Sequence, residues 1–287
     1  MPELPEVEIV CRGLNRFASG QFVEGVTVLR PQTFAYPPLS APLNLEDLQF
    51  GAWRRRGKYL LGELLQDGVN AGHLGVHLRM TGQLLWVPSN EPRAKHTKVC
   101  FHCRGGRDLR FIDIRTFGKL WRLPPGVAPE EIISGLQSLG PEPWAESFTP
   151  QFLEKRLHNS RRPIKTALLD QRLVAGLGNI YADEVLFQTG LHPLTPANAL
   201  TPAQIEALHR QIQQTLEQAI GAGGTTFSDF RGVTGINGNY GGQAWVYGRR
   251  GEPCRVCGAT IERLKIGGRS SHFCPQCQPS KGQIPAL

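Results

Sequence analysis

Four cysteines near the end of the chain have the spacing of a metal site. Cys254 and Cys257 form one C-x2-C pair, Cys274 and Cys277 form a second, and sixteen residues separate the pairs. Four thiolates can surround a zinc ion tetrahedrally and leave no position open, so such a site is structural rather than catalytic. The intervening residues alternate in polarity around a Gly-Gly pair, which predicts a β-hairpin with a two-residue turn. The sequence therefore predicts one structural zinc ion held by a hairpin.

The chain has seven cysteines, and three of them lie outside this pattern. Cys100 and Cys103 also form a C-x2-C pair, but they stand in a run that alternates like a β-strand, so we expect sheet side chains there. His96 and His102 lie close enough in sequence to be considered as partners, yet the strand pattern favours packing over a second zinc site. Cys11 lies on an apolar helical stripe and is expected in the core.

A Gly-x-Gly turn stands directly before a predicted helix in QRLVAGLGNIYADEVLF, where the helix begins at Asn179. Glycines let backbone N–H groups approach an anion, and the start of a helix carries partial positive charge. The turn therefore suits phosphate binding. The alternative is an ordinary glycine turn between two helices.

The chain opens with MPELPEVEIV, which places two prolines and three glutamates in the first eight positions. Proline and glutamate both favour the first turn of a helix. Over residues 6–17, apolar side chains including Val7, Val10 and Leu14 recur on one helical stripe. The local pattern predicts a helix. On this interpretation alone, the glutamates would only stabilise the first turn of that helix.

Composition limits the possible partners and locations. The 287 residues are 40% apolar, enough for two domains with cores, and Lys plus Arg exceed Asp plus Glu by 32 to 24, a net charge of +8. A basic excess favours an anionic partner, either nucleic acid or a membrane surface. No apolar run could cross a bilayer, and the first residues lack the layout of a signal peptide. We therefore expect a cytoplasmic protein whose reduced thiols bind metal.

The sequence predicts two regions of different secondary structure that would position these residues. From Phe22 to about Leu123, short alternating runs are separated by turn residues, which predicts an antiparallel sandwich or barrel. A Pro-rich stretch without periodicity follows as a linker. Thr149-Pro150 and Thr201-Pro202 then match an N-cap followed by proline at the first helical position, and the second helix is expected to stop at Gly221. The Gly-rich segment beyond it is expected to be mobile.

Five motifs occur along the chain in a fixed order: PELPEVE, RRRGKYLL, LVAGLGNIYADE, VYGRRGEPC and the four-cysteine finger. The ordered set resembles that of formamidopyrimidine-DNA glycosylases and spans nearly the whole chain. The resemblance implies a bacterial-type glycosylase and abasic-site lyase that removes oxidised purines, such as 8-oxoguanine and formamidopyrimidines, from double-stranded DNA. It also implies a monomer with one zinc ion, associated with the nucleoid.

The resemblance implies an α+β multidomain fold, with an N-terminal helix plus an antiparallel β-sandwich followed by a helix-two-turn-helix domain that ends in a β-hairpin zinc finger. The expected divisions are a catalytic β-sandwich domain at 1–130, a linker at 131–148, a helix-two-turn-helix DNA-binding region at 149–225, a mobile lesion-recognition loop and connection at 226–248, and the finger with its tail at 249–287.

The resemblance also assigns catalytic roles to four residues. Removal of Met1 would expose Pro2 as a secondary amine, and an α-amino group titrates about two pH units below lysine, so more of it is a free nucleophile. Glu3 corresponds to the acid/base partner that opens the sugar ring and moves protons. Glu6 would orient the first turn by hydrogen bonding. Lys58 resembles the lysine that contacts the damaged base and the DNA backbone, and the alternative for it is a solvated basic strand end.

DNA contacts follow from the same motifs. A glycosylase must flip its target nucleotide out of the helix, and side chains must then fill the vacated space. Met80 in HLRMTG, with Arg115 and Phe117 in IRTFG, match the residues that fill it, although Met80 and Phe117 could also be ordinary core residues. The remaining residues expected to bind phosphate, beside Lys58, are His77, Asn179 and Arg269.

Two other functions fit part of the sequence. An endonuclease VIII-like glycosylase has the same architecture but prefers oxidised pyrimidines, and its members usually lack this N-terminal motif and the Met, Arg and Phe set. A zinc-ribbon protein that binds DNA without chemistry would explain the charge and the finger, but it would leave PELPEVE unexplained.

Overall fold

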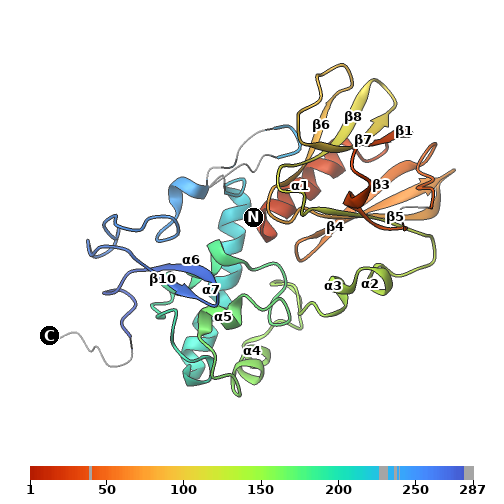
Figure 1. Cartoon of the computed structure of the whole chain (residues 1–287). Coiled ribbons are helices and arrows are strands. Elements are labelled where there is room, and N and C mark those ends of the chain that lie inside the picture. The colour runs from red at the N-terminus through yellow and green to blue at the C-terminus, as the bar shows by residue number, and fades with distance from the viewer. Residues whose placement is uncertain (39–40, 226–231, 236–237, 239, 281–287) are drawn as a thin grey trace. The chain divides into compact units, whose positions relative to one another are not determined.

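Contacts between residues divide the chain into two compact units. The first comprises Met1–Ser138 and Ala222–Asn239, and the second comprises Leu139–Gly221 and Tyr240–Leu287. The segment after Gly221 returns to the first unit, where the Trp86 N–H donates to the Val233 carbonyl at 2.9 Å. The computed structural model describes residues 1–38, 41–225, 232–235, 238 and 240–280 (Figure 1).

The described strands of the first unit form two sheets, which lie in separate layers (Figure 1). One sheet has the strand order β1-β7-β8-β6 and the other has the order β2-β9-β5-β4-β3. Neighbouring strands are antiparallel except for β2 and β9, which are parallel. This confirms the predicted antiparallel sandwich, with one parallel pair that alternation could not reveal. The strands are β1 (Val23–Val28), β2 (Phe34–Tyr36), β3 (Gln49–Arg56), β4 (Tyr59–Gln66), β5 (Val69–His77), β6 (Gly82–Pro88), β7 (Thr97–Cys103), β8 (Arg107–Asp113) and β9 (Lys119–Leu123).

The core of this unit unites both sheets with helix α1 (Leu4–Phe17). Alternate strand positions supply large buried side chains, and the rings of Phe50 and Phe101 meet edge-on with centroids 6.0 Å apart. On the predicted stripe of α1, Val7, Val10 and Leu14 are fully buried, Cys11 is nearly so and Phe17 is half-buried. Asn15 joins the helix to β3, because its amide donates to the Trp53 carbonyl at 2.7 Å and accepts from the Trp53 N–H at 2.9 Å. Hydrophobic burial and these bonds hold α1 against the sheet.

The Pro-rich stretch, which the sequence predicts as a linker without periodicity, carries some secondary structure. It contains two short helices, α2 (Pro129–Ile132) and α3 (Ser134–Gln137), and Ile133 and Leu136 are buried. Helices of four residues are too short to display a 3.6-residue period, which is why the sequence pattern did not indicate them.

The second unit is helical, as predicted. Both expected N-caps form, since Thr149 accepts from the Phe152 N–H at 3.1 Å and Thr201 accepts from the Gln204 N–H at 3.3 Å. The amide of Gln188 donates to the Thr215 hydroxyl at 3.1 Å and joins the two long helices, α6 and α7. The helices are α4 (Pro150–Leu157), α5 (Ile164–Leu168), α6 (Asn179–Gln188) and α7 (Pro202–Gly221), and short 3-10 turns are η1 (Pro31–Thr33) in the first unit and η2 (Ala197–Ala199) and η3 (Tyr240–Gln243) in the second.

The predicted hairpin is formed by β10 (Glu262–Ile266) and β11 (Arg269–Phe273). Its turn is Gly267-Gly268, with φ of +54° and +79°, a backbone conformation that only glycine adopts readily. Among the described helices, none combines the length and apolar character needed to cross a membrane. The expected lesion-recognition loop and C-terminal tail fall in large part on residues 226–231, 236–237, 239 and 281–287, which lie outside the described residues.

Candidate functional site

The first residues of the chain are buried. Pro2 lies in the interior, and Glu3 and Glu6 are each 1% exposed. One oxygen of the Glu6 carboxylate accepts from the Glu3 N–H at 2.8 Å, and the other accepts from the Thr225 N–H at 2.9 Å and the Thr225 hydroxyl at 3.1 Å. The Glu6 carboxylate therefore joins the start of α1 to the residue at the base of the expected loop.

Lys58 stands in the two-residue turn between β3 and β4 and is 8% exposed, so it is no solvated strand end. Arg55 joins this turn to α1: its Nε donates to Glu8 at 2.8 Å, and its Nη1 donates to the Gly57 carbonyl at 3.2 Å. Burial opposes ionisation of Glu8, but hydrogen bonds from Arg55 and Arg12 outweigh it and lower the pKa of the Glu8 carboxyl. The sequence offered a signal for the Glu8–Arg12 pair in its four-residue spacing, but none for Arg55.

His77 ends β5 opposite Tyr59 of β4, and their rings meet edge-on with centroids 4.4 Å apart. The Arg79 N–H donates to His77 Nδ1 at 3.0 Å, so the proton of the neutral ring is on Nε2. Burial, together with the cations Arg79 and Lys58, lowers the pKa of His77 to about 3. The imidazole is therefore a neutral, oriented donor at physiological pH.

The expected gap-filling residues lie in two turns of the first unit. Met80, between β5 and β6, is half-buried, whereas Arg115 and Phe117, between β8 and β9, are exposed. The Phe117 side chain is 51% exposed, which excludes ordinary core packing for it. Arg115 Cζ lies 5.1 Å from the centroid of the Phe117 ring. Two apolar or aromatic groups and a guanidinium are thus presented on neighbouring turns.

In the second unit, Asn179 is the first residue of α6, as predicted. Gln171 braces the preceding glycine turn: it accepts from the Gly176 N–H at 2.9 Å and donates to the Leu177 carbonyl at 2.7 Å. The Asn179 amide donates to the Ser270 carbonyl at 2.9 Å, one residue after the exposed Arg269. The predicted phosphate-binding turn and the zinc hairpin are therefore directly joined.

Asp183, which the sequence did not single out, strengthens this junction. Its buried carboxylate accepts from Lys165 Nζ at 2.6 Å, the Ser271 hydroxyl at 2.7 Å and the His272 N–H at 2.8 Å. Lys165 is 1% exposed and also donates to the Asn179 carbonyl at 2.8 Å. One buried ion pair thus holds α5, α6 and β11 together.

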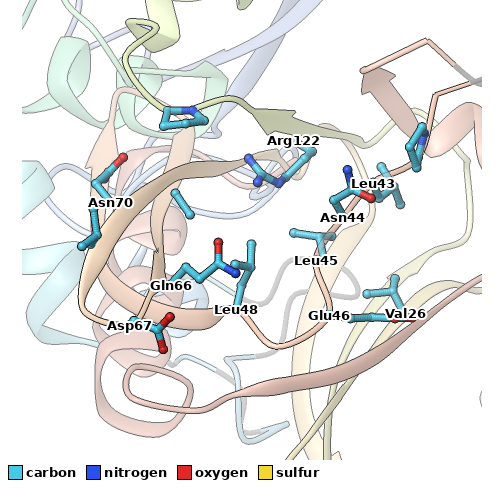
Figure 2. Close-up of a pocket in the computed structure, with 14 residues that line it drawn as sticks. Val26, Leu43, Asn44, Leu45, Glu46, Leu48, Gln66, Asp67, Asn70 and Arg122 are labelled. Atoms are coloured by element: carbon cyan, nitrogen blue, oxygen red, sulfur yellow. The ribbon is translucent and has the colours of Figure 1, made fainter.

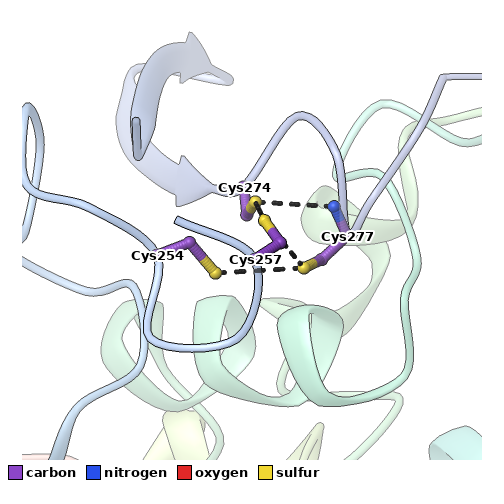
Figure 3. A group of neighbouring side chains, drawn as sticks. All are labelled: Cys254, Cys257, Cys274 and Cys277. Carbon is purple, nitrogen blue, oxygen red and sulfur yellow. Dashed lines mark hydrogen bonds between the residues drawn. The ribbon is translucent and has the colours of Figure 1, made fainter. Parts of the chain in front are cut away.

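The four expected zinc ligands gather in one place (Figure 3). Their Sγ atoms all lie within 4.8 Å of one another, with 3.9 Å between Cys254 and Cys277 and 3.4 Å between Cys257 and Cys274. Zinc–sulfur bonds of about 2.3 Å in a regular tetrahedron require S–S distances of about 3.8 Å. The four thiolates therefore fit one structural zinc ion, which would fasten the hairpin to the preceding loop.

The remaining cysteines behave as expected. Cys100 and Cys103 are buried on β7, and burial raises the pKa of the Cys103 thiol to about 12. His102 instead bonds with Asp108 at 2.9 Å. Burial likewise raises the pKa of Cys11 to about 11. Within the described part of the chain, no second cluster of three or more His, Cys, Asp or Glu residues could hold a metal ion.

A cavity of about 870 Å³ lies elsewhere in the first unit (Figure 2). Leucines including Leu43, Leu45 and Leu48 line it together with Asn70 and Arg122. None of the residues that the sequence singled out is among its lining residues. The candidate residues of this unit lie instead in or beside turns and at the start of the chain.

The fold and the site define a two-unit protein: a sheet-rich unit carries a buried, proline-headed acidic N-terminus, and a helical unit carries a four-thiolate finger. Three family models match this arrangement. They are described as "Formamidopyrimidine-DNA glycosylase N-terminal domain" at residues 1–120, "Formamidopyrimidine-DNA glycosylase H2TH domain" at 139–231, and "Zinc finger found in FPG and IleRS" at 251–279.

Similarity to known proteins points to the same family as the family models. A formamidopyrimidine-DNA glycosylase of Rippkaea orientalis is 59% identical over 281 residues, covering 97% of this chain and 100% of the relative. A Lactococcus lactis Fpg solved with DNA containing an abasic site is 35% identical, with a TM-score of 0.87 and coverage of 97% and 100%. The same coverage, identity and TM-score hold for the wild-type Lactococcus lactis Fpg with DNA containing an oxidized pyrimidine. The chain belongs to the formamidopyrimidine-DNA glycosylase family.

Proposed function

We propose that this protein repairs duplex DNA by excising oxidised purines and then cleaving the abasic site, with Pro2 as its nucleophile. The observation that carries the proposal is the buried chain start, where Glu3 follows Pro2 directly and the Glu6 carboxylate accepts from the Glu3 N–H. Relatives at 59% and 58% identity over nearly their full length bear the name of this glycosylase.

The first step uses groups that the chain itself supplies. After removal of Met1, the lone pair of the Pro2 nitrogen attacks C1′ of the damaged nucleotide, and the bond between C1′ and the base breaks. The departing base takes the electron pair of that bond and the proton that the Pro2 nitrogen loses once it is bonded to C1′. Glu3 donates a proton to the ring oxygen as the sugar opens, which leaves an iminium between Pro2 and C1′.

The iminium then acts as an electron sink. Loss of a proton from C2′ expels the 3′ phosphate, and loss of a further proton from C4′ expels the 5′ phosphate. Water finally hydrolyses the iminium and regenerates the Pro2 amine. Glu3 is the group we propose for moving these protons, while Glu6 acts as a positioning residue through its bond to the Glu3 backbone.

We propose that several fixed donors hold the DNA. His77 would donate from Nε2 to a phosphate, and Lys58, Asn179 and Arg269 would contact the backbone and, for Lys58, the damaged base. Met80, Arg115 and Phe117 would fill the space left by the flipped nucleotide, with Arg115 paired to the orphaned cytosine. A structural zinc ion on the four thiolates would hold Arg269 at the tip of a stable hairpin.

Borohydride trapping tests the proposed nucleophile. Reduction during turnover of a duplex carrying 8-oxoguanine opposite cytosine should give a covalent protein–DNA adduct, and sequencing of the adduct should find the DNA on Pro2. A matched protein that keeps its initiator methionine should form no adduct. Full activity of that protein would refute the role of Pro2. The absence of any adduct with correctly processed protein would leave only DNA binding.

Oxidised pyrimidines are the second candidate substrates, because a 35% identical protein of known structure was solved with DNA containing one. Excision rates for 8-oxoguanine opposite cytosine and for thymine glycol should be compared in the same duplex. We expect the purine to be removed faster. A strong preference for thymine glycol would reverse the assignment.

We further propose that the protein works as a monomer in the cytoplasm, at the nucleoid. The net charge of +8 supports an anionic polymer as its partner. Gel filtration at working concentration and fractionation with chromosomal DNA would test these two points.

A further inference from the structure

The two turns that carry Met80, Arg115 and Phe117 are built as a pair. β5 and β9 lie in one sheet and β6 and β8 lie in the other, so both turns cross between the sheets. Register places them side by side, since His77 pairs with Lys119 and Gly82 pairs with Asp113. The turns at residues 78–81 and 114–118 are called the paired turns below.

One buried carboxylate joins the paired turns. Asp113, at the end of β8, is 1% exposed. Its Oδ1 accepts from the Thr81 hydroxyl at 2.5 Å and from the Arg115 N–H at 3.2 Å, and its Oδ2 accepts from the Gly118 N–H at 2.7 Å. Thr81 Oγ1 also accepts from the Arg115 N–H at 3.0 Å. Thr81 is therefore the side chain through which the Met80 turn is fastened to the Arg115 turn.

The backbone of both turns needs such support. Arg79 and Thr116 have φ of +55° and +59°, in the left-handed region that residues other than glycine seldom adopt. At Gly118 an added Cβ would lie 2.5 Å from Phe111 Cζ and 3.1 Å from Asp113 Oδ2, so a side chain there would displace the Phe111 ring and crowd the carboxylate. The bonds to Asp113 maintain a conformation that the turns would not adopt alone.

We propose that Asp113, acting through Thr81, is a positioning residue that locks Met80, Arg115 and Phe117 into one preformed wedge for opening the duplex. This inference rests on the proposed function. A wedge that is already ordered inserts without first losing conformational freedom, so more of the binding energy is available for unstacking the base. Without the Thr81 hydroxyl, the Met80 turn loses its bond to Asp113, and Arg115 loses one acceptor for its N–H.

The experiment compares Thr81→Val, which keeps the shape but removes the hydroxyl, with Thr81→Ser, which keeps the hydroxyl. Each is measured in single turnover on two substrates: duplex DNA with 8-oxoguanine opposite cytosine, and single-stranded DNA with a preformed abasic site. The second substrate needs the same lyase chemistry but no unstacking. We expect Thr81→Val to excise from duplex on the order of tenfold more slowly and to cleave the single strand within about twofold of wild type. Thr81→Ser should match wild type on both.

A fluorescent 2-aminopurine beside the lesion provides a readout that does not depend on cleavage. Its increase in fluorescence on unstacking should be slower with Thr81→Val and unchanged with Thr81→Ser. The inference is overturned if Thr81→Val opens and excises duplex like wild type, if both variants lose activity equally, or if Thr81→Val loses activity equally on both substrates. Failure of the wild-type protein itself to form the borohydride adduct would instead count against the proposed function.

Discussion

The buried pair of Lys165 and Asp183 yields the largest predicted effect on stability. The two side chains are 1% and 0% exposed, and Asp183 accepts hydrogen bonds from both Ser271 and His272 as well. In Asp183→Asn an amide N–H replaces one acceptor oxygen, so the buried ammonium of Lys165 faces a weaker and partly repulsive partner. Breaking a buried ion pair on one side costs about 3–5 kcal/mol.

This cost should appear as a large thermal shift. For domains of this size, 1 kcal/mol moves the melting temperature by about 3–6 °C, so the transition of the second unit should fall by about 10–30 °C. Differential scanning calorimetry of the whole chain measures it. Asp170→Asn is the matched control, because Asp170 pairs with Arg162 at the surface, where the two side chains are 29% and 40% exposed. That variant should lose about 1 kcal/mol or less.

A double-mutant cycle isolates the pair itself. Lys165→Met combined with Asp183→Asn removes the cation that the single change leaves unpaired. The double variant should therefore be less destabilised than the sum of the two single variants by about 2 kcal/mol or more. If the single costs simply add, or if Asp183→Asn behaves like Asp170→Asn, the pair does not hold the helices to the hairpin and the reasoning is wrong.

Three further predictions concern the other parts of the site. Removal of zinc, or Cys277→Ser, should lower the affinity for damaged duplex DNA at least about tenfold. The sheet-rich unit should keep its own thermal transition, because the thiolates fasten only the hairpin. Unchanged affinity would exclude the finger from DNA binding. Glu8→Gln should lower stability at pH 7 by about 1 kcal/mol, against no change for the exposed Glu46→Gln, since it breaks the bond to Arg55. Because the pKa of Glu8 is lowered in the folded state, this contribution is present above about pH 4.3, the unfolded pKa, and is lost as pH falls through the folded pKa. Urea titrations should therefore show that the difference in unfolding free energy between wild type and Glu8→Gln shrinks at low pH. A difference that stays constant with pH would contradict the ion pair. His77→Leu should weaken DNA binding about five- to tenfold, and by the same factor at pH 5.5 as at pH 8, because wild-type His77, with a pKa of about 3, stays neutral across that range. A loss of affinity that is larger at pH 5.5 would indicate a charged imidazole.

Local spacing in the sequence determined much of this protein. The four zinc cysteines, the Gly267-Gly268 turn and the helix starts at Pro150, Asn179 and Pro202 were all predicted, and the structure confirms them. Each depends on the geometry of a few neighbouring residues, such as a cap or a turn, so a short stretch of sequence is sufficient. The ordered motifs also indicated the family correctly.

Only the tertiary structure determined which charged side chains meet. Nothing in the sequence pairs Glu8 with Arg55, and Asp183 lies 88 residues before its partner Ser271. Burial of Lys58, and the meeting of Thr81 with Asp113, likewise depend on strand register. The physical reason is that local spacing fixes how neighbours in a helix or turn face one another, whereas distant partners are brought together by sheet pairing and core packing. Those are cooperative properties of the whole chain, and no single segment contains them.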